Sequence, residues 1–171
     1  MTGPIPLEFT NLSNLQEFRI AGSGVGGVFP TELGPVMTSL HRLELGENNF
    51  VGTIMTEFGL MTSMSWLALN GNDFKGKIPT EFGNLVNMTR LSLQDTLITG
   101  VIPTELGRMT RLENLVLDKN GITGHTPEEV CKLRDLLLDT FVTDCPARGD
   151  AGVVCPIPDC CTFCRRGESS N

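Results

Sequence analysis

Apolar residues recur along this chain at a fixed interval of 24 residues, and the polar residues between them recur with the same period. The motif Gly-x-Ile-Pro-Thr-Glu-Phe/Leu-Gly, or a close variant, begins at Gly3, Gly27, Gly52, Gly76, Gly100 and Gly124, so one interval is 25 residues. A period of this length is typical of a solenoid, in which each unit buries its apolar side against its neighbours. The pattern predicts a stack of similar coils, with function on the surface that the stack presents.

Each repeat contains a short alternation of apolar and polar residues, as at Leu91 and Leu93. This alternation predicts a strand whose apolar side chains point inward, and stacked copies would form a parallel sheet. The inward positions are Leu12, Leu15, Phe18, Ile20, Val36, Leu40, Leu43, Leu45, Phe50, Met61, Met64, Leu67, Leu69, Phe74, Leu85, Met88, Leu91, Leu93, Ile98, Met109, Leu112, Leu115, Leu117 and Ile122. We expect the one-residue excess between Val36 and Leu40, on a turn.

A polar residue follows each predicted strand at the same place, and the series is Ser23, Asn48, Asn72, Thr96 and Asn120. An amide or hydroxyl there can bond the backbone of adjacent turns, where the chain bends away from its ladder partners. The Gly and Ile-Pro that follow predict an extended turn, and Thr-Glu-Phe/Leu-Gly predicts a brief helical turn on the outer face. The interior residues of that turn are Leu33, Phe58, Phe82 and Leu106.

These residues resemble the leucine-rich repeat family, and the Leu-x-Gly-x-Ile-Pro element is similar to its plant-type subclass. That subclass occurs in receptor-like kinase ectodomains and polygalacturonase-inhibiting proteins, and the resemblance covers roughly residues 3–136. It implies an α/β fold: a right-handed solenoid with a concave parallel β-sheet and a convex side of 3-10 or irregular turns. A second short strand is implied near each Gly-x-Ile-Pro. Family membership fixes architecture far better than ligand.

The repeat pattern decays after Leu133. Thr126-Pro127-Glu128-Glu129 forms a capping box with proline at the first helical position, which predicts a helix over about 127–137. We therefore expect three parts: a solenoid of about five repeats over 1–126 that begins within a repeat, a helix and cysteine-rich cap over 127–164, and a polar tail over 165–171. Because the first coil would expose an unpaired edge, a capping segment is expected before Met1.

All six cysteines lie near the end of the chain, at Cys131, Cys145, Cys155, Cys160, Cys161 and Cys164. Three disulfides would let cross-linked loops with little core of their own cover the last apolar edge. The fifteen possible pairings stay open. Zinc is the competing interpretation, since the last four cysteines offer four thiolates without forming two separated Cys-x2-Cys knuckles. The run also resembles the terminal caps of leucine-rich repeat proteins in single-celled algae.

Composition excludes several classes of partner. The 171 residues carry 13 basic and 20 acidic side chains, a net charge of -7, and no basic block, so nucleic-acid binding is not expected. No run of about 18 apolar residues is present, so no membrane contact is expected within this segment. The plant-type resemblance and the disulfides favour an extracellular or cell-surface location, although the segment lacks a secretory signal. Asn11 and Asn87 begin glycosylation triplets, which supports that location.

The outward side chains of the predicted strands form columns, and one column reads Glu17, Arg42, Trp66, Arg90 and Asn114. The only Trp of the chain thus lies between two arginines on the predicted concave face. Trp and Arg dominate the binding energy of many interfaces, and a guanidinium can stack on an indole. With Glu44 and Asp95 from adjacent columns, these residues are the predicted ligand-binding surface. The alternative is that Arg42 and Arg90 only cover an exposed indole.

No catalytic constellation is found. His41 and His125 lie on different repeats without a paired nucleophile, and the recurring glutamates Glu32, Glu57, Glu81 and Glu105 are separated by the repeat. We predict no enzyme, no cofactor and no metal. The leading hypothesis is recognition of a protein or peptide, or a carbohydrate, across the concave face. The alternatives are a structural or adhesive component of a cell surface or wall, and a secreted inhibitor of a wall-degrading enzyme.

Overall fold

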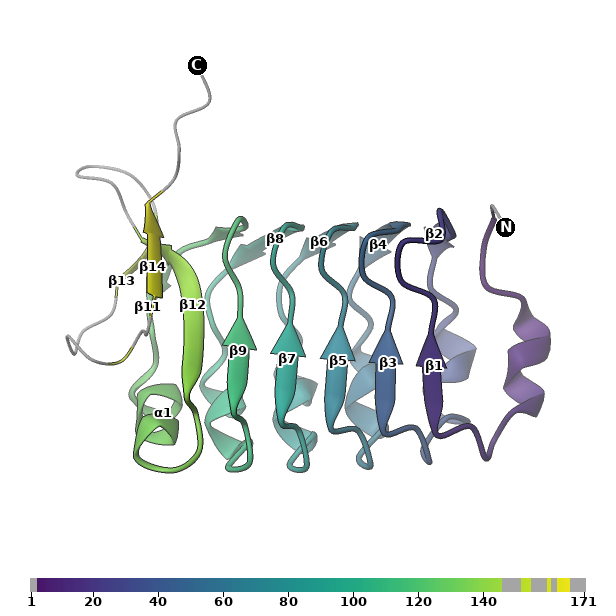
Figure 1. Cartoon of the computed structure of the whole chain (residues 1–171), viewed down its shortest axis with the longest axis horizontal. Helices are drawn as coiled ribbons and strands as arrows, with labels where there is room; N and C mark the ends of the chain where they lie inside the picture. The colour runs from purple at the N-terminus through teal and green to yellow at the C-terminus, as the bar shows by residue number, and fades with distance from the viewer. Residues whose placement is uncertain (1–2, 146–151, 155–159, 161–162, 167–171) are drawn as a thin grey trace, which may run out of the picture.

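A computed structural model of the chain describes residues 3–145, 152–154, 160 and 163–166. Over these residues, short parallel strands stack into a seven-stranded sheet, here called the front sheet, which runs along the molecule (Figure 1). Its strands in spatial order are β1 (Glu17–Arg19), β3 (Arg42–Glu44), β5 (Trp66–Ala68), β7 (Arg90–Ser92), β9 (Asn114–Val116), β12 (Thr140–Cys145) and β14 (Phe163–Arg166). The predicted parallel sheet is confirmed.

A second sheet and a row of short helices lie behind the front sheet (Figure 1). The second sheet pairs β2 (Gly26–Val28), β4 (Asn49–Thr53), β6 (Asp73–Gly76), β8 (Leu97–Gly100) and β10 (Gly121–Ile122). The 3-10 helices are η1 (Leu7–Asn11), η2 (Thr31–Leu33), η3 (Thr56–Leu60), η4 (Thr80–Asn84) and η5 (Thr104–Arg108). Both the second strand beside Gly-x-Ile-Pro and the helical turn after it are confirmed.

The core is a set of repeated layers between the two sheets and the helices. Leu67, Leu91 and Leu115 of adjacent front strands are fully buried, as are the interior Leu or Phe residues of η2, η3, η4 and η5. Phenylalanines also stack from coil to coil, with ring centroids of Phe50 and Phe74 6.0 Å apart and nearly parallel. Each coil therefore buries its apolar side chains against identical positions in the coils beside it.

The predicted polar ladder is present. Asn72 is 5% exposed, and its Nδ2 donates to the carbonyl oxygens of Leu69 at 3.0 Å and of Leu45 in the preceding coil at 2.9 Å. Its Oδ1 accepts from the backbone N–H of Phe50 at 2.9 Å. One side chain thus satisfies backbone groups of two coils that strand pairing leaves without a partner. The Nδ2 groups of Asn48 and Asn120 make the equivalent two bonds. Thr96 fills its rung with a hydroxyl that lies 2.6 Å from Oδ1 of Asn120 and 3.2 Å from the carbonyl oxygen of Leu93.

A close approach between helical turns explains the Gly of the Thr-Glu-Phe/Leu-Gly motif. A Cβ placed on Gly83 would lie 2.7 Å from both the carbonyl oxygen and the Cβ of Glu105 in the next coil. The equivalent contact joins Gly59 to Glu81. Gly is therefore required for successive turns to touch, and the recurring Glu supplies the surface against which it packs.

The first coils differ from the prediction in two places. Met37, and not Val36, occupies the buried position before Leu40, and the backbone N–H of Met37 bonds to the carbonyl of Leu33. The extra residue therefore lies in the turn after η2, where one wider turn keeps the later positions in phase. Leu12, predicted to point inward, is 40% exposed, because no preceding coil covers the first coil in this structure.

The helix after the last repeat is shorter than predicted. The α-helix α1 covers only Glu128–Cys131 and continues as the 3-10 helix η6 (Lys132–Asp135), while Pro127 is extended and precedes the helix. Leu136 and Leu137 are both 55% exposed, so a longer helix would have no apolar face to bury. The chain instead turns to place Leu138 in the core before β12 begins.

The predicted cap extends the front sheet. Strand β12 pairs with β9 and β14, and β11 (Gly124–His125) pairs with β13 (Val153–Val154). Asp144 continues the polar ladder, because its two carboxylate oxygens each accept a 2.8 Å bond from the backbone of Lys119 and Asn120.

One disulfide, Cys131–Cys160, joins α1 to the cap. The side chains of Cys145 and Cys164, and all of Cys155 and Cys161, lie outside the described residues. The other two predicted bridges and the predicted domain boundaries therefore stay predictions.

Replacing Asn72 with Ala should lower the free energy of unfolding by about 2–4 kcal/mol, since it leaves buried backbone groups of two coils unpaired. Asn72→Thr should cost roughly half as much, because Thr96 shows that a hydroxyl can occupy a rung. Urea denaturation of both variants measures the difference. Equal stability of wild type and Asn72→Ala would contradict a structural role for the ladder.

Candidate functional site

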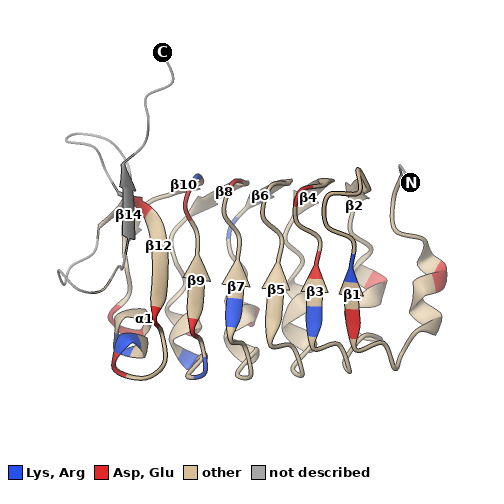
Figure 2. Ribbon diagram, viewed as in Figure 1, with Lys and Arg blue, Asp and Glu red and all other residues tan. Residues whose placement is uncertain are grey.

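The predicted column is present on the open face of the front sheet. Strand pairing places Glu17 beside Arg42, Arg42 beside Trp66, Trp66 beside Arg90, and Arg90 beside Asn114. Because adjacent strands lie about 4.8 Å apart, neighbouring side chains in this column are close enough to contact one another. Figure 2 shows the charges that result: β1 and β3 carry both signs, β5 is uncharged and β7 is basic.

The indole of Trp66 lies between two guanidinium groups. The Cζ atom of Arg42 is 3.7 Å from the centroid of the Trp66 ring, and that of Arg90 is 4.6 Å away. Trp66 is half-buried in this arrangement. Each cation is attracted to the electron-rich face of the ring, which holds the three side chains in a row.

Glu44 fixes one of these arginines. Its Oε1 accepts from Nε of Arg42 at 2.9 Å and pairs with Nη2 of the same guanidinium. Its Oε2 accepts from Nε of Arg19 at 2.9 Å, and Nη1 of Arg19 lies 3.7 Å from Glu17. A continuous network therefore runs from Glu17 through Arg19, Glu44 and Arg42 to Trp66. Guanidinium and carboxylate groups match in geometry, so this network orders the side chains.

The network also lowers the pKa of Glu44. Partial burial by itself raises the pKa of this carboxyl, but hydrogen bonds from Arg42 and Arg19, with their positive charges, outweigh burial and bring the pKa below its ordinary value. Glu44 is therefore ionised at neutral pH and holds Arg42 against the indole.

Arg90 differs from Arg19 of β1 and Arg42 of β3. Among the residues that the structure describes, no carboxylate forms an ion pair with it, and its contact is with the Trp66 ring. The positions beside Trp66 and Arg90 in the next column are Ala68, Ser92 and Val116, which are small and uncharged. The charges on β1 and β3 are thus paired with one another, whereas β5, β7 and β9 carry one unpaired cation, Arg90, beside small uncharged side chains.

Asp95, also predicted for the ligand-binding surface, lies away from this cluster. It follows β7 at the rim of the front sheet and has a left-handed backbone, with φ at 56°. Its coil therefore presents Arg90 and Asp95 at separate places.

Sequence analysis identified the column but missed the network around Glu44. The signal for this network was the Arg-x-Glu spacing on β3, since residues two apart on a strand share a face.

The predicted glycosylation sites differ in their surroundings. Asn11 is exposed at the end of η1. Asn87 is half-buried, with its Nδ2 donating to the carbonyl of Thr62 at 3.1 Å and its Oδ1 accepting from Arg111 at 3.2 Å. Modification at either site stays a prediction.

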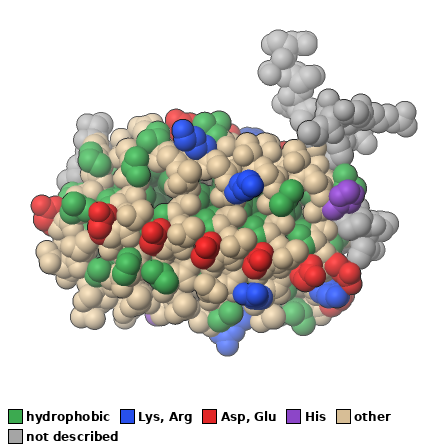
Figure 3. Space-filling model, turned by 180° about the vertical axis from the view of Figure 1, so that it is seen from behind, with side chains coloured by type: hydrophobic (Ala, Val, Ile, Leu, Met, Phe, Trp, Pro, Cys, Tyr) green, Lys and Arg blue, Asp and Glu red, His purple; other side chains and the backbone are tan. Residues whose placement is uncertain are grey.

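The rear of the molecule carries a row of acidic side chains (Figure 3). A Glu lies in the first turn of each of η2, η3, η4 and η5. Within the described ranges, no group of three or more His, Cys, Asp or Glu is arranged to hold a metal ion. No helix in those ranges is both long and apolar enough to cross a membrane.

Comparison with known proteins agrees with this architecture. A family model described as Leucine Rich Repeat matches residues 63–85 and 111–133. No curated protein gives a significant match to the sequence.

Several solved structures from Arabidopsis thaliana are similar. The ectodomain of the receptor kinase GASSHO1/SCHENGEN3, in complex with CASPARIAN STRIP INTEGRITY FACTOR 2, is 32% identical over 85% of this chain and 18% of its own, with a TM-score of 0.76. The HAESA ectodomain, in complex with an N-terminally extended IDA peptide hormone, is 26% identical over 85% of this chain and 25% of its own, with a TM-score of 0.75. A chain of the BIR3–SERK2 complex is 28% identical over 70% of this chain and 63% of its own, with a TM-score of 0.65.

This chain therefore spans less than two thirds of each of these structures. The stacked coils, the family match and these neighbours lead to one conclusion. The chain belongs to the leucine-rich repeat family, and the solved structures that it resembles are ectodomains of plant receptor kinases.

Proposed function

We propose that the chain is an extracellular recognition module that binds a protein or peptide ligand through the open face of the front sheet. The observation that carries the proposal is the half-buried Trp66 between Arg42 and Arg90 on that face. Trp and Arg are enriched among the residues that dominate interface energies, and a rigid aromatic ring contributes a large contact area.

Preorganisation supports the same proposal. Binding costs free energy when flexible side chains must be ordered, and long arginine side chains are flexible. Here Arg42 is already held by Glu44 and by the Trp66 ring. A ligand that contacts this row meets an ordered surface, so less of its interaction energy is lost to ordering.

The neighbours and the disulfide support the class of ligand and the location. Two similar structures hold a protein factor or a peptide hormone on a receptor ectodomain. Disulfides such as Cys131–Cys160 persist in oxidising compartments. We therefore propose a recognition role, without catalysis, outside the cell or at its surface.

The test uses a displayed library of random 15-residue peptides, selected on the wild-type chain. For a selected peptide, the Trp66→Ala, Arg90→Ala double variant should bind at least about tenfold more weakly, because both anchors are lost. The control is Val28→Ser, which changes an apolar residue of β2 that is 63% exposed and lies outside the front sheet. It should change affinity less than about twofold.

Melting temperatures of all three proteins check that folding is retained. Selected peptides that bind the double variant as tightly as wild type would contradict the proposal. The two arginines would then serve only to cover the indole.

The Glu44 network predicts a pH effect in the free protein. Because the folded-state pKa of Glu44 is lowered, its stabilising contribution is present above the unfolded-state pKa and is lost as pH falls through the folded-state pKa. Protonation releases Arg42, so the fluorescence of Trp66, the only Trp, should change at a pH below the ordinary carboxyl pKa. Glu44→Gln should lack this transition. A transition of the same midpoint in the variant would assign it to another group.

A further inference from the structure

Three residues after each of the first five strands of the front sheet, the backbone adopts a left-handed conformation, yet the residue at this position varies between coils. The series is Gly22, Glu47, Gly71, Asp95 and Lys119, with φ between 56° and 63°. Gly adopts this conformation without steric cost, whereas other residues are strained there. Since two coils use Gly, the fold does not require a side chain at this rim. The charged side chains are therefore candidates for contact with a partner.

Glu47 is held in a defined position over the coil that contains Trp66. The Nδ2 of Asn70 donates to its Oε1 at 2.9 Å. A Cβ on Gly71 would lie 2.6 Å from the same oxygen, so the absence of a side chain at Gly71 makes room for the carboxylate. In the described part of the chain, no Lys or Arg forms an ion pair with Glu47. Asp95 follows on the other side of Gly71, in the next coil.

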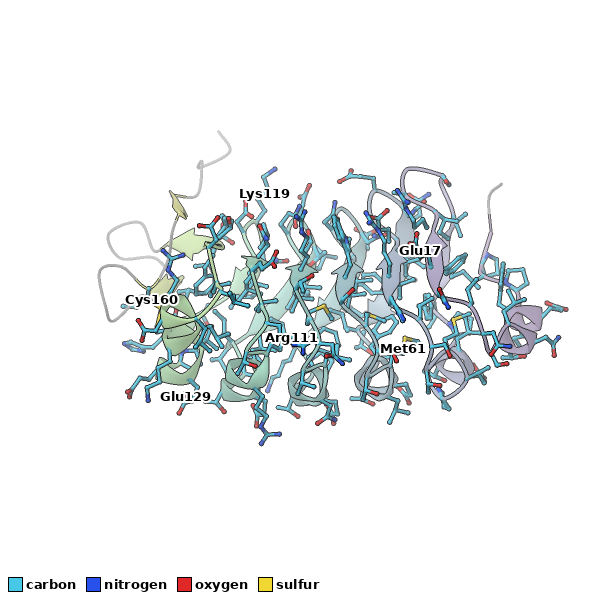
Figure 4. The ribbon with its side chains drawn as sticks, turned by 60° about the horizontal axis from the view of Figure 1, so that its bottom comes forward. Glu17, Met61, Arg111, Lys119, Glu129 and Cys160 are labelled. Atoms are coloured by element: carbon cyan, nitrogen blue, oxygen red, sulfur yellow. A yellow bond between two sulfur atoms is a disulfide. The ribbon has the colours of Figure 1, made fainter. Side chains whose placement is uncertain are left out.

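An unpaired cation lies at the start of β7, the strand beside the coil that contains Trp66. Arg42 and Arg19 are paired with Glu44, and Arg19 also with Glu17, whereas Arg90 stacks on Trp66 without a carboxylate partner among the described residues. Between the two ends lie Ala68 and, in the adjacent strand, Ser92. Figure 4 shows Lys119, the counterpart of Glu47 in a later coil, at the upper edge of the coils.

We infer that the face around Trp66 binds a bipolar peptide segment, with a carboxylate at Arg90 of the next coil, a basic group at Glu47 of the preceding coil and small uncharged residues between them. Gly71 lies five residues after Trp66, so the two positions are at most about 16 Å apart at the rise of a strand. An extended peptide spans that length when its acidic and basic groups are three to five residues apart. The segment lies along the strand direction, across the stack. This inference rests on the proposed function and specifies its ligand.

The peptides selected on the wild-type chain provide the probe. They should share an acidic and a basic residue three to five positions apart. Glu47→Gly should weaken a selected peptide about tenfold, and should have no effect on the same peptide with its basic residue changed to Gln. Arg90→Gln should weaken binding of the selected peptide about tenfold, and should have no effect on the same peptide with its acidic residue changed to the corresponding amide. Acetylated and amidated versions show whether the charges come from termini or from side chains.

Lys119→Gly is the matched control, because it also replaces a charged residue with Gly at the equivalent backbone position, two coils from Gly71. It should leave affinity unchanged. Glu47→Gly should retain the fold, since Gly occupies the equivalent position in two other coils, at Gly22 and Gly71. A melting temperature close to that of the wild type verifies this.

The outcomes separate the two proposals. Selected peptides whose affinity depends on Trp66, but which share no charge pattern or whose basic residue is not coupled to Glu47, would overturn the bipolar ligand. Recognition by this face would stay intact. Binding that is insensitive to the Trp66→Ala, Arg90→Ala change would overturn both.

Discussion

The structure depends on one constraint: each coil can bury its apolar side only against the coils beside it, so every coil must keep the same register. Parallel pairing meets this constraint residue for residue, from Glu17 through Arg42 and Trp66 to Arg90. The inward leucines, the phenylalanine rows and the asparagine ladder all need that register. Outward side chains are free of it, and this freedom lets the front sheet carry a surface of mixed chemistry.

The periodic part of the fold, and the column at the centre of the site, could be predicted from sequence. A fixed period and a parallel sheet determine which outward residues become neighbours, so the order Arg42, Trp66, Arg90 followed without any knowledge of side-chain conformation. The cation–π contacts then arise because guanidinium and indole groups lie on adjacent strands.

The features that depart from the period could not be predicted as well. The extra residue was placed after Val36, but the turn after η2 absorbs it and buries Met37, because hydrophobicity alone does not distinguish two adjacent apolar residues. The helix over 127–137 is short because Leu136 and Leu137 find no core to cover. The Cys131–Cys160 pairing was one of several open choices.

The directions of the outward side chains could not be predicted from the sequence either. Glu44 could have turned toward solvent, yet it bridges Arg42 and Arg19. Glu47 leans over Gly71 because Asn70 holds it and no Cβ blocks it. Such choices depend on the space left by neighbouring coils, which the repeat pattern does not specify.

Quenching of Trp66 fluorescence tests the central claim most directly, because the chain has a single Trp. A half-buried indole between two guanidinium groups should be quenched by iodide more strongly than by caesium, since the local charge attracts the anion. Arg90→Gln should reduce that preference. An indole that neither ion quenches, or one that both quench equally, would contradict an accessible aromatic residue between two arginines on the front sheet.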